Sequence, residues 1–167
     1  MGIIKKLHPH EAHKIAAGEV IERPVHALKE LIENSIDAKT DRIDIVAEEG
    51  GKKLLSITDT GCGIAPDDLP LAIARHATSK ISSIDDLAAL HTHGFRGEAL
   101  ASIAAVSTLT IISRQNGSPE GATICAAGET ISPVTPCAAP VGTTIRVENI
   151  FEQIPVRRAF LKSTESE

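Results

Sequence analysis

Hydrophobic and polar residues recur with a helical period in the stretch PVHALKELIENSIDA, residues 24–38. Pro24 suits the first position of a helix, because its missing N–H would be unpaired there in any case. At about 100° per residue, large apolar side chains collect on one side of this helix. We expect that apolar face to consist of Ile21, Val25, Leu28, Ile32 and Ile36.

Three polar residues fall on the opposite side of the same predicted helix. Glu30, Asn34 and Asp37 are spaced i, i+4 and i+7, so they stack along one line. A carboxylate and an amide oxygen one turn apart suit Mg²⁺, which takes oxygen ligands and completes its shell with water and substrate phosphates. The alternative is an ordinary surface helix with a solvated polar stripe. Asn34 favours a site, because Asn is a poor helix former and has no cap to make in mid-helix.

Shorter patterns predict a sheet and further helices. Alternation over 42–47 and apolar residues over 53–58, joined by the turn EEGG, indicate a β-hairpin. The 11–17 segment is predicted to be a short helix that ends at Gly18. Further strands are expected at 109–114, 122–126 and 143–147, and further helices at 66–77 and 84–90.

The motif DTGCGI, residues 59–64, follows the second predicted strand. Two glycines separated by one residue let a backbone approach a flat ligand closely. Asp59 is an acceptor-only group that suits an amine donor. The alternative is a polar turn at a strand end. Thr143 stands at the start of the last predicted strand, where its hydroxyl faces a pocket or caps a turn.

Two further stretches suit an anionic ligand. In GFRGEALASI, residues 94–103, a glycine-rich loop opens into an Ala-rich helix, so free N–H groups and the positive dipole end suit a phosphate. The alternative is a plain junction between a loop and a helix. The spacing is not that of a Walker A loop. The cationic stretch RHATSK, residues 75–80, is either a lid over an anion or a solvated loop.

Composition narrows the class of protein. The 167 residues are expected to form one domain, with three Phe, no Tyr, no Trp and a net charge of −5. Few aromatic residues and a negative charge disfavour nucleic-acid binding by base stacking or by a basic surface. Three cysteines without a CxxC pair, no signal sequence and no membrane-spanning run predict a reduced, cytoplasmic protein. Zinc binding is disfavoured for the histidines at 8, 10 and 13, and Arg157, Arg158 and Lys162 are expected on a solvated surface.

Together these motifs resemble the N-terminal ATPase region of the MutL family of DNA mismatch-repair proteins. That family belongs to a group with gyrase B, a heat-shock chaperone and sensor histidine kinases. The resemblance runs from IAAGEVIERP (15–24) to RRAFL (157–161), and its specific parts are ENSIDA (33–38), RHATSK and GFRGEALASI. It implies the Bergerat ATP-binding fold, an α/β two-layer sandwich whose mixed, mainly antiparallel sheet is covered on one face by helices.

The resemblance also implies roles for individual residues. Glu30 would be the general base that orients the attacking water, Asn34 the Mg²⁺ ligand, and Asp59 the acceptor for the adenine amino group. The residues implied to bind ATP are Asn34, Asp37, Ala38, Asp59, Gly61, Gly63, Ile64, Thr78, Ser79, Lys80, Gly94, Phe95, Arg96, Gly97, Glu98, Ala99, Leu100 and Thr143.

The chain departs from the family pattern at a few positions. Thr60 stands where the family usually has Asn, Lys39 where it usually has Gly, and FEQIPVRRAF (151–160) replaces the usual FYNTPARRKF. The family's ATPase region continues into a second subdomain that contributes a lysine to the γ-phosphate, and we expect this chain to stop before it.

The function implied is a Mg²⁺-dependent, slowly hydrolysing ATP switch in mismatch repair. Its expected partners are a second copy, in an ATP-promoted homodimer, and mismatch-recognition and downstream repair proteins, with weak DNA binding outside this stretch. Two alternatives remain. One is a nucleotide-binding module without turnover. The other is a histidine-kinase-like catalytic domain, which shares the Asn and DxGxG elements but normally lacks RHATSK and GFRGEAL.

Overall fold

The computed structural model describes residues 9–74, 98–128, 130–164 and 166–167 of the chain. The helices are α1 (Pro9–Val20), α2 (Pro24–Asp37), α3 (Leu69–Ile73), α4 (Ala99–Val106) and α5 (Pro155–Ala159), with short 3₁₀ turns η1 (Glu49–Gly51) and η2 (Pro66–Asp68). The strands are β1 (Ile43–Glu48), β2 (Leu54–Asp59), β3 (Thr108–Arg114), β4 (Gly121–Ala127), β5 (Thr130–Ile131), β6 (Thr135–Cys137) and β7 (Gly142–Glu148).

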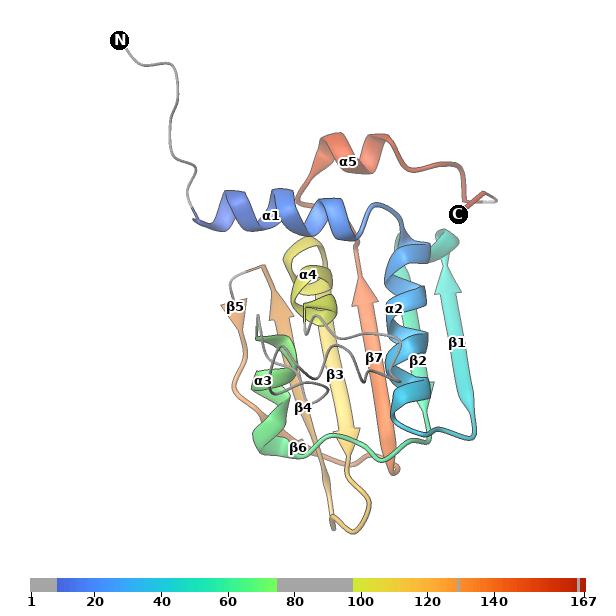
Figure 1. The fold of residues 1–167 in the computed structure, drawn as a ribbon, viewed down its shortest axis with the longest axis vertical. Helices are drawn as coiled ribbons and strands as arrows, with labels where there is room; N and C mark the ends of the chain where they lie inside the picture. Colours follow the sequence, from blue (N-terminus) through green and yellow to red (C-terminus); the bar gives the residue numbers. More distant parts are fainter. Residues whose placement is uncertain (1–8, 75–97, 129, 165) are drawn as a thin grey trace, which may run out of the picture.

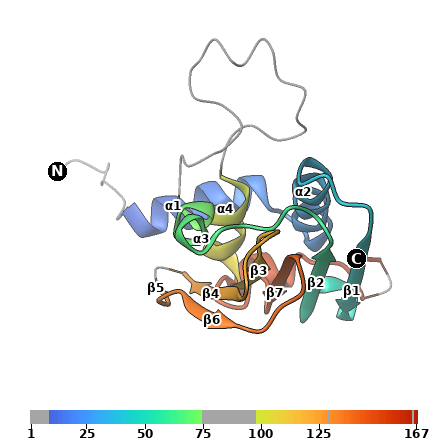
Figure 2. The ribbon, with the colours of Figure 1, turned by 90° about the horizontal axis from the view of Figure 1, so that it is seen from below.

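The strands form one sheet in the order β1-β2-β7-β3-β4-β5, and β6 pairs with β4. Every pairing among the described strands is antiparallel. Helices α2, α3 and α4 lie over one face of this sheet, and α1 lies on the same side, next to α4 and across the ends of the strands, as Figure 1 and Figure 2 show from two directions. The predicted two-layer sandwich with a mainly antiparallel sheet is therefore confirmed. The predicted hairpin of β1 and β2 is confirmed too, whereas the short strands β5 and β6 and helix α5 were missed.

The core lies between the helices and the sheet. Alternate residues of the central strands are buried, as the period of a strand requires. The largest of them are Leu55, Ile57, Leu109, Ile111, Ile124 and Val147. The residues between them are half-buried and mostly polar. Thr58 and Thr144, for example, join β2 to β7 through hydroxyl groups 3.0 Å apart. The sheet thus has one apolar face, against which the helices pack.

Helix α2 begins at Pro24 as predicted, but its apolar face was predicted correctly only in part. Ile21 is fully buried, and Leu28 and Ile32 pack partly buried against the core. Val25 and Ile36 are 41% and 48% exposed. The buried line is instead Pro24, Ala27, Leu31 and Ser35. This line is turned from the predicted one by about one residue step, or about 100°. Ala27 and Ser35 in this line are small, so the helix can approach the sheet closely there. The contacts made by this close approach decide which face is buried, although larger apolar residues lie beside it.

Two other helix boundaries differ from those predicted. Helix α1 continues through Gly18 to Val20, so Gly18 is not a terminator. A Cβ at Gly18 would lie 3.1 Å from the guanidinium group of Arg157, which therefore packs directly on this glycine. The predicted 66–77 helix is a 3₁₀ turn followed by the short helix α3, which ends before the extended residue Ala74. The predicted 84–90 helix lies outside the described residues.

Candidate functional site

The centre of the candidate site is the carboxylate of Asp59, the last residue of β2. The residue is only 6% exposed. Its Oδ1 accepts hydrogen bonds from the N–H groups of Gly61, at 2.9 Å, and Thr143, at 3.3 Å. Its Oδ2 accepts a hydrogen bond from the hydroxyl of Ser35, at 3.0 Å. All three donors are uncharged, so hydrogen bonds and not an ion pair hold this buried charge.

Three glycines bring the strand ends close around Asp59. A Cβ at Gly61 would lie 2.8 Å from both Cβ and O of Ala38, just after α2. A Cβ at Gly63 would collide with the backbone oxygen of Arg114, and one at Gly142 with that of Asp59. Gly63 and Gly142 also have positive φ angles of 73° and 117°. Packing within the protein therefore requires these glycines, whether or not a flat ligand also approaches them.

A second hydroxyl group, that of Ser113, joins three neighbouring segments. This side chain is 1% exposed. Its Oγ accepts a hydrogen bond from Ile64 N at 2.8 Å, donates to Gly142 O at 3.0 Å and lies 2.8 Å from Thr143 Oγ1. When Ser113 donates to Gly142 O, Thr143 donates to Ser113, and all three contacts are satisfied at once. Thr143 then presents its lone pairs to any further donor.

Sequence reasoning missed both Ser35 and Ser113. The available signal was a serine at a buried position of an otherwise apolar pattern. Ser113 continues the buried alternation of β3, and Ser35 lies one helical turn after the buried Leu31. A buried hydroxyl needs a partner, so each serine indicated a polar neighbour.

The predicted polar stripe of α2 lies on the flank of the buried line rather than opposite to it. Glu30, Asn34 and Asp37 are each half-buried. Ala38, which follows α2, donates its N–H to Asn34 O at 3.0 Å and accepts a hydrogen bond from Cys62 N at 3.1 Å. The helix end that carries the stripe is thus tied directly to the turn after Asp59.

The predicted phosphate segment is described only in part. Glu98, Ala99 and Leu100 are half-buried at the N-terminal end of α4, which lies between α3 and α2 in the helix layer (Figures 1 and 2). The other residues predicted to contact phosphates, Thr78, Ser79, Lys80, Gly94, Phe95, Arg96 and Gly97, lie outside the described residues.

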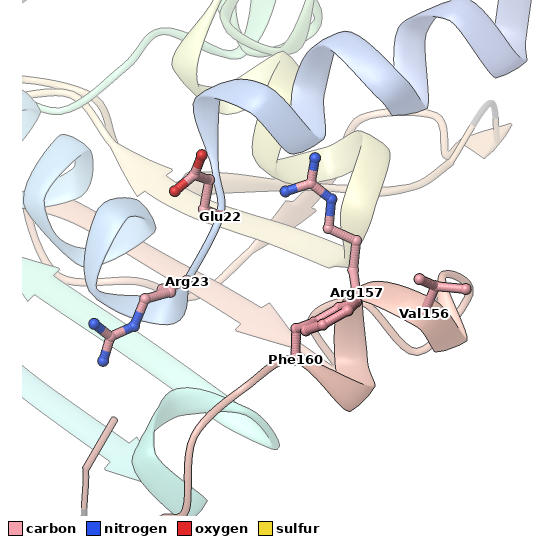
Figure 3. Close-up of a pocket in the computed structure, with 5 residues that line it drawn as sticks. All are labelled: Glu22, Arg23, Val156, Arg157 and Phe160. Atoms are coloured by element: carbon pink, nitrogen blue, oxygen red, sulfur yellow. The ribbon is translucent and has the colours of Figure 1, made fainter.

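A separate cavity of about 400 Å³ lies near the other end of α2. It is lined by Glu22, Arg23, Val156, Arg157 and Phe160 (Figure 3). Arg157 is half-buried and reaches from α5 toward α1, so the prediction that it is a solvated surface residue was wrong. None of the residues predicted to bind a ligand lines this cavity.

Cys62, Cys125 and Cys137 are free thiols. Within 9–74, 98–128 and the described C-terminal residues, no three His, Cys, Asp or Glu side chains gather to form a metal site. No helix in these same ranges has the length and apolar character needed to cross a membrane.

Comparison with curated proteins finds DNA mismatch repair proteins among the relatives of this chain. The chain is 50% identical over 167 residues to the DNA mismatch repair protein MutL of Heliobacterium modesticaldum, covering all of this chain and 25% of that protein. It is 53% identical over 165 residues to MutL of Escherichia coli, covering 98% of this chain and 27% of that protein. The chain thus spans about a quarter of the length of these relatives.

Solved structures give the same result at the level of the fold. The MutL ATPase domain of Aquifex aeolicus, complexed with ADP, has a TM-score of 0.70 and 32% identity, with 88% of this chain and 50% of that chain covered. The N-terminal domain of a DNA repair protein has a TM-score of 0.73 and 31% identity, with 89% and 42% covered.

A family model decides the assignment. Residues 22–129 match the model described as histidine kinase-, DNA gyrase B-, and HSP90-like ATPase. The match covers more than half of the chain and includes α2, the turn after Asp59 and the start of α4. The chain therefore belongs to the histidine kinase-, DNA gyrase B- and HSP90-like ATPase family.

Proposed function

We propose that this chain binds ATP between its helix layer and its sheet, and that it hydrolyses ATP slowly as the ATPase part of a DNA mismatch-repair protein. The observation that carries the proposal is Asp59, a buried acceptor-only group held by uncharged donors at the end of β2. The ADP in the Aquifex aeolicus neighbour and the MutL relatives support the same nucleotide class.

Asp59 would accept a hydrogen bond from the 6-amino group of adenine. Guanine has a keto oxygen at this position, which would face the carboxylate and leave two buried acceptors unpaired. One hydrogen bond to a charged group contributes about 1.5–3 kcal/mol. Gly61, Gly63, Ile64 and Thr143 would line the base pocket beside this carboxylate.

Asn34 and Glu30 would act at the phosphate end. Their oxygens fit a Mg²⁺ site, because Mg²⁺ takes one or two protein oxygens and completes its shell with water and phosphate oxygens. When bound, Mg²⁺ would neutralise triphosphate charge. Asp37 and Ala38 would border the nucleotide at the end of α2. Glu30 would orient the attacking water and accept its proton.

The remaining phosphate contacts are assigned by the family resemblance. Glu98, Ala99 and Leu100 would offer N–H groups at the start of α4, where the helix dipole favours an anion. Thr78 to Lys80 and Gly94 to Gly97 would complete the phosphate contacts.

A nucleotide titration tests the binding step. We expect this chain to bind ATP with Mg²⁺ at least tenfold more tightly than GTP, and Asp59→Ala to lose most of that binding. Asp67→Ala, at an exposed acidic residue of η2, is the matched control and should bind as the wild type does. Equal affinity for ATP and GTP would refute the role given to Asp59.

A pair of variants separates binding from chemistry. Glu30→Ala should bind Mg-ATP with nearly normal affinity, because a general base acts mainly as the reaction proceeds. Its rate of phosphate release should fall about 10²–10⁴-fold. Asn34→Ala should weaken binding itself, since triphosphate charge is then poorly compensated.

Phosphate release is best measured in the longer protein, because this chain covers half of the Aquifex aeolicus ATPase domain. Full turnover by Glu30→Ala in that protein would contradict the role of Glu30. ATP binding with no phosphate release even there would favour the alternative of a non-hydrolysing nucleotide-binding module.

For the longer protein we propose a cytoplasmic ATP switch in which residues 1–167 form a single ATP-binding domain. ATP would promote a homodimer and contacts with mismatch-recognition and downstream repair proteins. The identity with MutL over the whole chain supports this assignment over a histidine-kinase-like domain. Sedimentation of the longer protein with and without ATP tests it, and an ATP-independent oligomeric state would contradict the switch.

A further inference from the structure

We infer that Ser35 is a positioning residue for base recognition, which aims the Asp59 carboxylate so that one acceptor position is left for the ligand. This inference rests on the proposed function, because it concerns how the same carboxylate selects its base. It goes further in giving a role to a residue outside the predicted site.

The contact between the two side chains has a fixed direction. Ser35 is 3% exposed and lies in the buried line of α2. Its Oγ lies 3.0 Å from Asp59 Oδ2. An ionised carboxylate only accepts hydrogen bonds, so the serine must donate, and its single proton is directed at Oδ2.

The hydrogen bond from Ser35 leaves the Asp59 carboxylate with one open acceptor position. A carboxylate has about four lone-pair positions, two on each oxygen. Gly61 and Thr143 occupy both positions on Oδ1, and Ser35 occupies one on Oδ2. One position remains, on Oδ2, and it matches a single N–H of an exocyclic amine.

The three donors differ in how firmly they are placed. The N–H groups of Gly61 and Thr143 belong to a backbone that close glycine contacts hold in place. The Oδ2 side has Ser35, whose hydroxyl is fixed by a helix that packs on the core. Without this hydroxyl, Oδ2 keeps two open positions, and the terminal torsion of the aspartate, which is intrinsically broad, is less restrained.

The consequence is a change in selectivity more than in affinity. A less restrained carboxylate makes a poorer hydrogen bond to an amine, and it also repels a keto oxygen less, because it can turn away or bind a water between them. The two effects act in opposite directions on a base with an amino group and on a base with a keto group at this position. The ratio of their affinities is therefore the quantity that Ser35 controls.

The test uses ATP and inosine triphosphate, which carry an amino and a keto group at position six of the purine. The keto base also has a proton on N1, where adenine accepts, so the quantity compared is the change in preference between the wild type and each Ser35 variant. For the wild-type chain with Mg²⁺ we expect a preference for ATP of at least about tenfold. Ser35→Ala should reduce this preference to about threefold or less, and Ser35→Thr, which keeps the hydroxyl, should retain it. Ser35→Cys, close to serine in size and with a weak donor, should be intermediate and serves if Ser35→Ala does not fold.

The matched control is Ser107→Ala. Ser107 is also a buried serine, but its Oγ donates to Ile103 O at 2.7 Å within α4 and does not contact Asp59. The thermal unfolding midpoint of each variant is measured beside its affinities. Ser107→Ala should lower the midpoint and leave the nucleotide preference at its wild-type value.

The outcomes separate this inference from the proposed function. A wild-type chain that binds neither nucleotide refutes the proposed function. A wild-type chain that prefers ATP, with an unchanged preference in Ser35→Ala or with both affinities lowered by the same factor, overturns the inference and leaves the proposed function standing.

Discussion

The two ends of α2 are held against the rest of the molecule by different kinds of contact. At its C-terminal end, backbone meets backbone: Gly61 packs on Ala38, and Gly63 packs on the carbonyl group of Arg114. At its N-terminal end, Pro24 packs on Gly51, but the contacts toward α5 and the C-terminal residues are made by side chains. Arg23 pairs with Glu167 at 3.0 Å, and a cavity of about 400 Å³ separates this end of the helix from α5.

This difference predicts that the C-terminal end of α2 can hold a ligand in one fixed geometry and that the N-terminal end cannot. A backbone contact between strand ends cannot yield without moving a strand, whereas an arginine or an exposed phenylalanine moves at little cost. Phe160, at the N-terminal end of α2, is 82% exposed. Asp59, at the other end, is buried and bonded on both oxygens. A recognition site needs rigid supports like those around Asp59.

The largest effect is expected at the backbone contacts. Gly63→Ala should destabilise the fold by about 3 kcal/mol, because left-handed strain and overpacking against Arg114 add together. Gly117→Ala is the matched control. It has φ +85° but nothing within 4 Å of the added Cβ, so it should cost about 1 kcal/mol. Chemical denaturation of both variants measures the difference, and equal costs would contradict a rigid Asp59 end.

A smaller effect is expected from Ser113→Ala. The substitution leaves the N–H of Ile64 and the hydroxyl of Thr143 without a buried partner, which costs about 1–3 kcal/mol. Ser132→Ala, which removes a partner of Cys125 N near the edge of the sheet, should be comparable in stability. Only Ser113→Ala should also weaken ATP binding, and a titration of both variants distinguishes them.

The opposite end should tolerate a comparable change. Gly18→Ala adds a Cβ whose three nearest neighbouring atoms all belong to the flexible guanidinium group of Arg157, at 3.1 Å. Alanine inside a helix is favoured over glycine by about 1 kcal/mol. We therefore expect the free energy of unfolding, measured by thermal unfolding, to stay the same or to rise by up to about 1 kcal/mol. A loss of 2 kcal/mol or more would show that this end is as rigid as the other.

The smallest effect concerns Lys39, which has φ 57° directly after the C-cap of α2. Left-handed backbone costs a non-glycine residue about 1–2 kcal/mol, and glycine loses about 0.5–1 kcal/mol of that gain through chain entropy. Lys39→Gly should thus stabilise the protein by about 0.5 kcal/mol. Ala38→Gly, one residue earlier at φ −75°, should destabilise it instead, and a result of the same sign for both would contradict this account.

Sequence patterns predicted the elements of the sheet well, because a strand pattern with period two depends on burial of one face. The 53–58 and 109–114 segments fall within a residue of β2 and β3. The predicted face of α2 is turned by about one residue step from the buried line, because the pattern counts large apolar residues and cannot measure how closely a helix approaches a sheet. Ala27 and Ser35 are buried for that second reason.

The site was predictable to a similar degree. Asp59 and the glycines after it stand out by residue type, since a charged group and two glycines at a strand end are unusual in a buried pattern. Ser35 and Ser113 do not stand out, because their importance comes from partners that are far apart in sequence. The positive φ of Lys39 results from the connection that follows α2, and the signal for it was the glycine that the family usually has at this position.

The most direct test of the central claim is the amide spectrum of the chain during a titration with Mg-ATP. We predict that the N–H signals of Gly61 and Thr143, which both bond Asp59 Oδ1, shift as ATP binds. The signals of Glu22, Arg23 and Arg157, around the cavity at the other end of α2, should stay in place. Shifts confined to Glu22, Arg23 and Arg157, with Gly61 and Thr143 unchanged, would contradict a nucleotide site at Asp59.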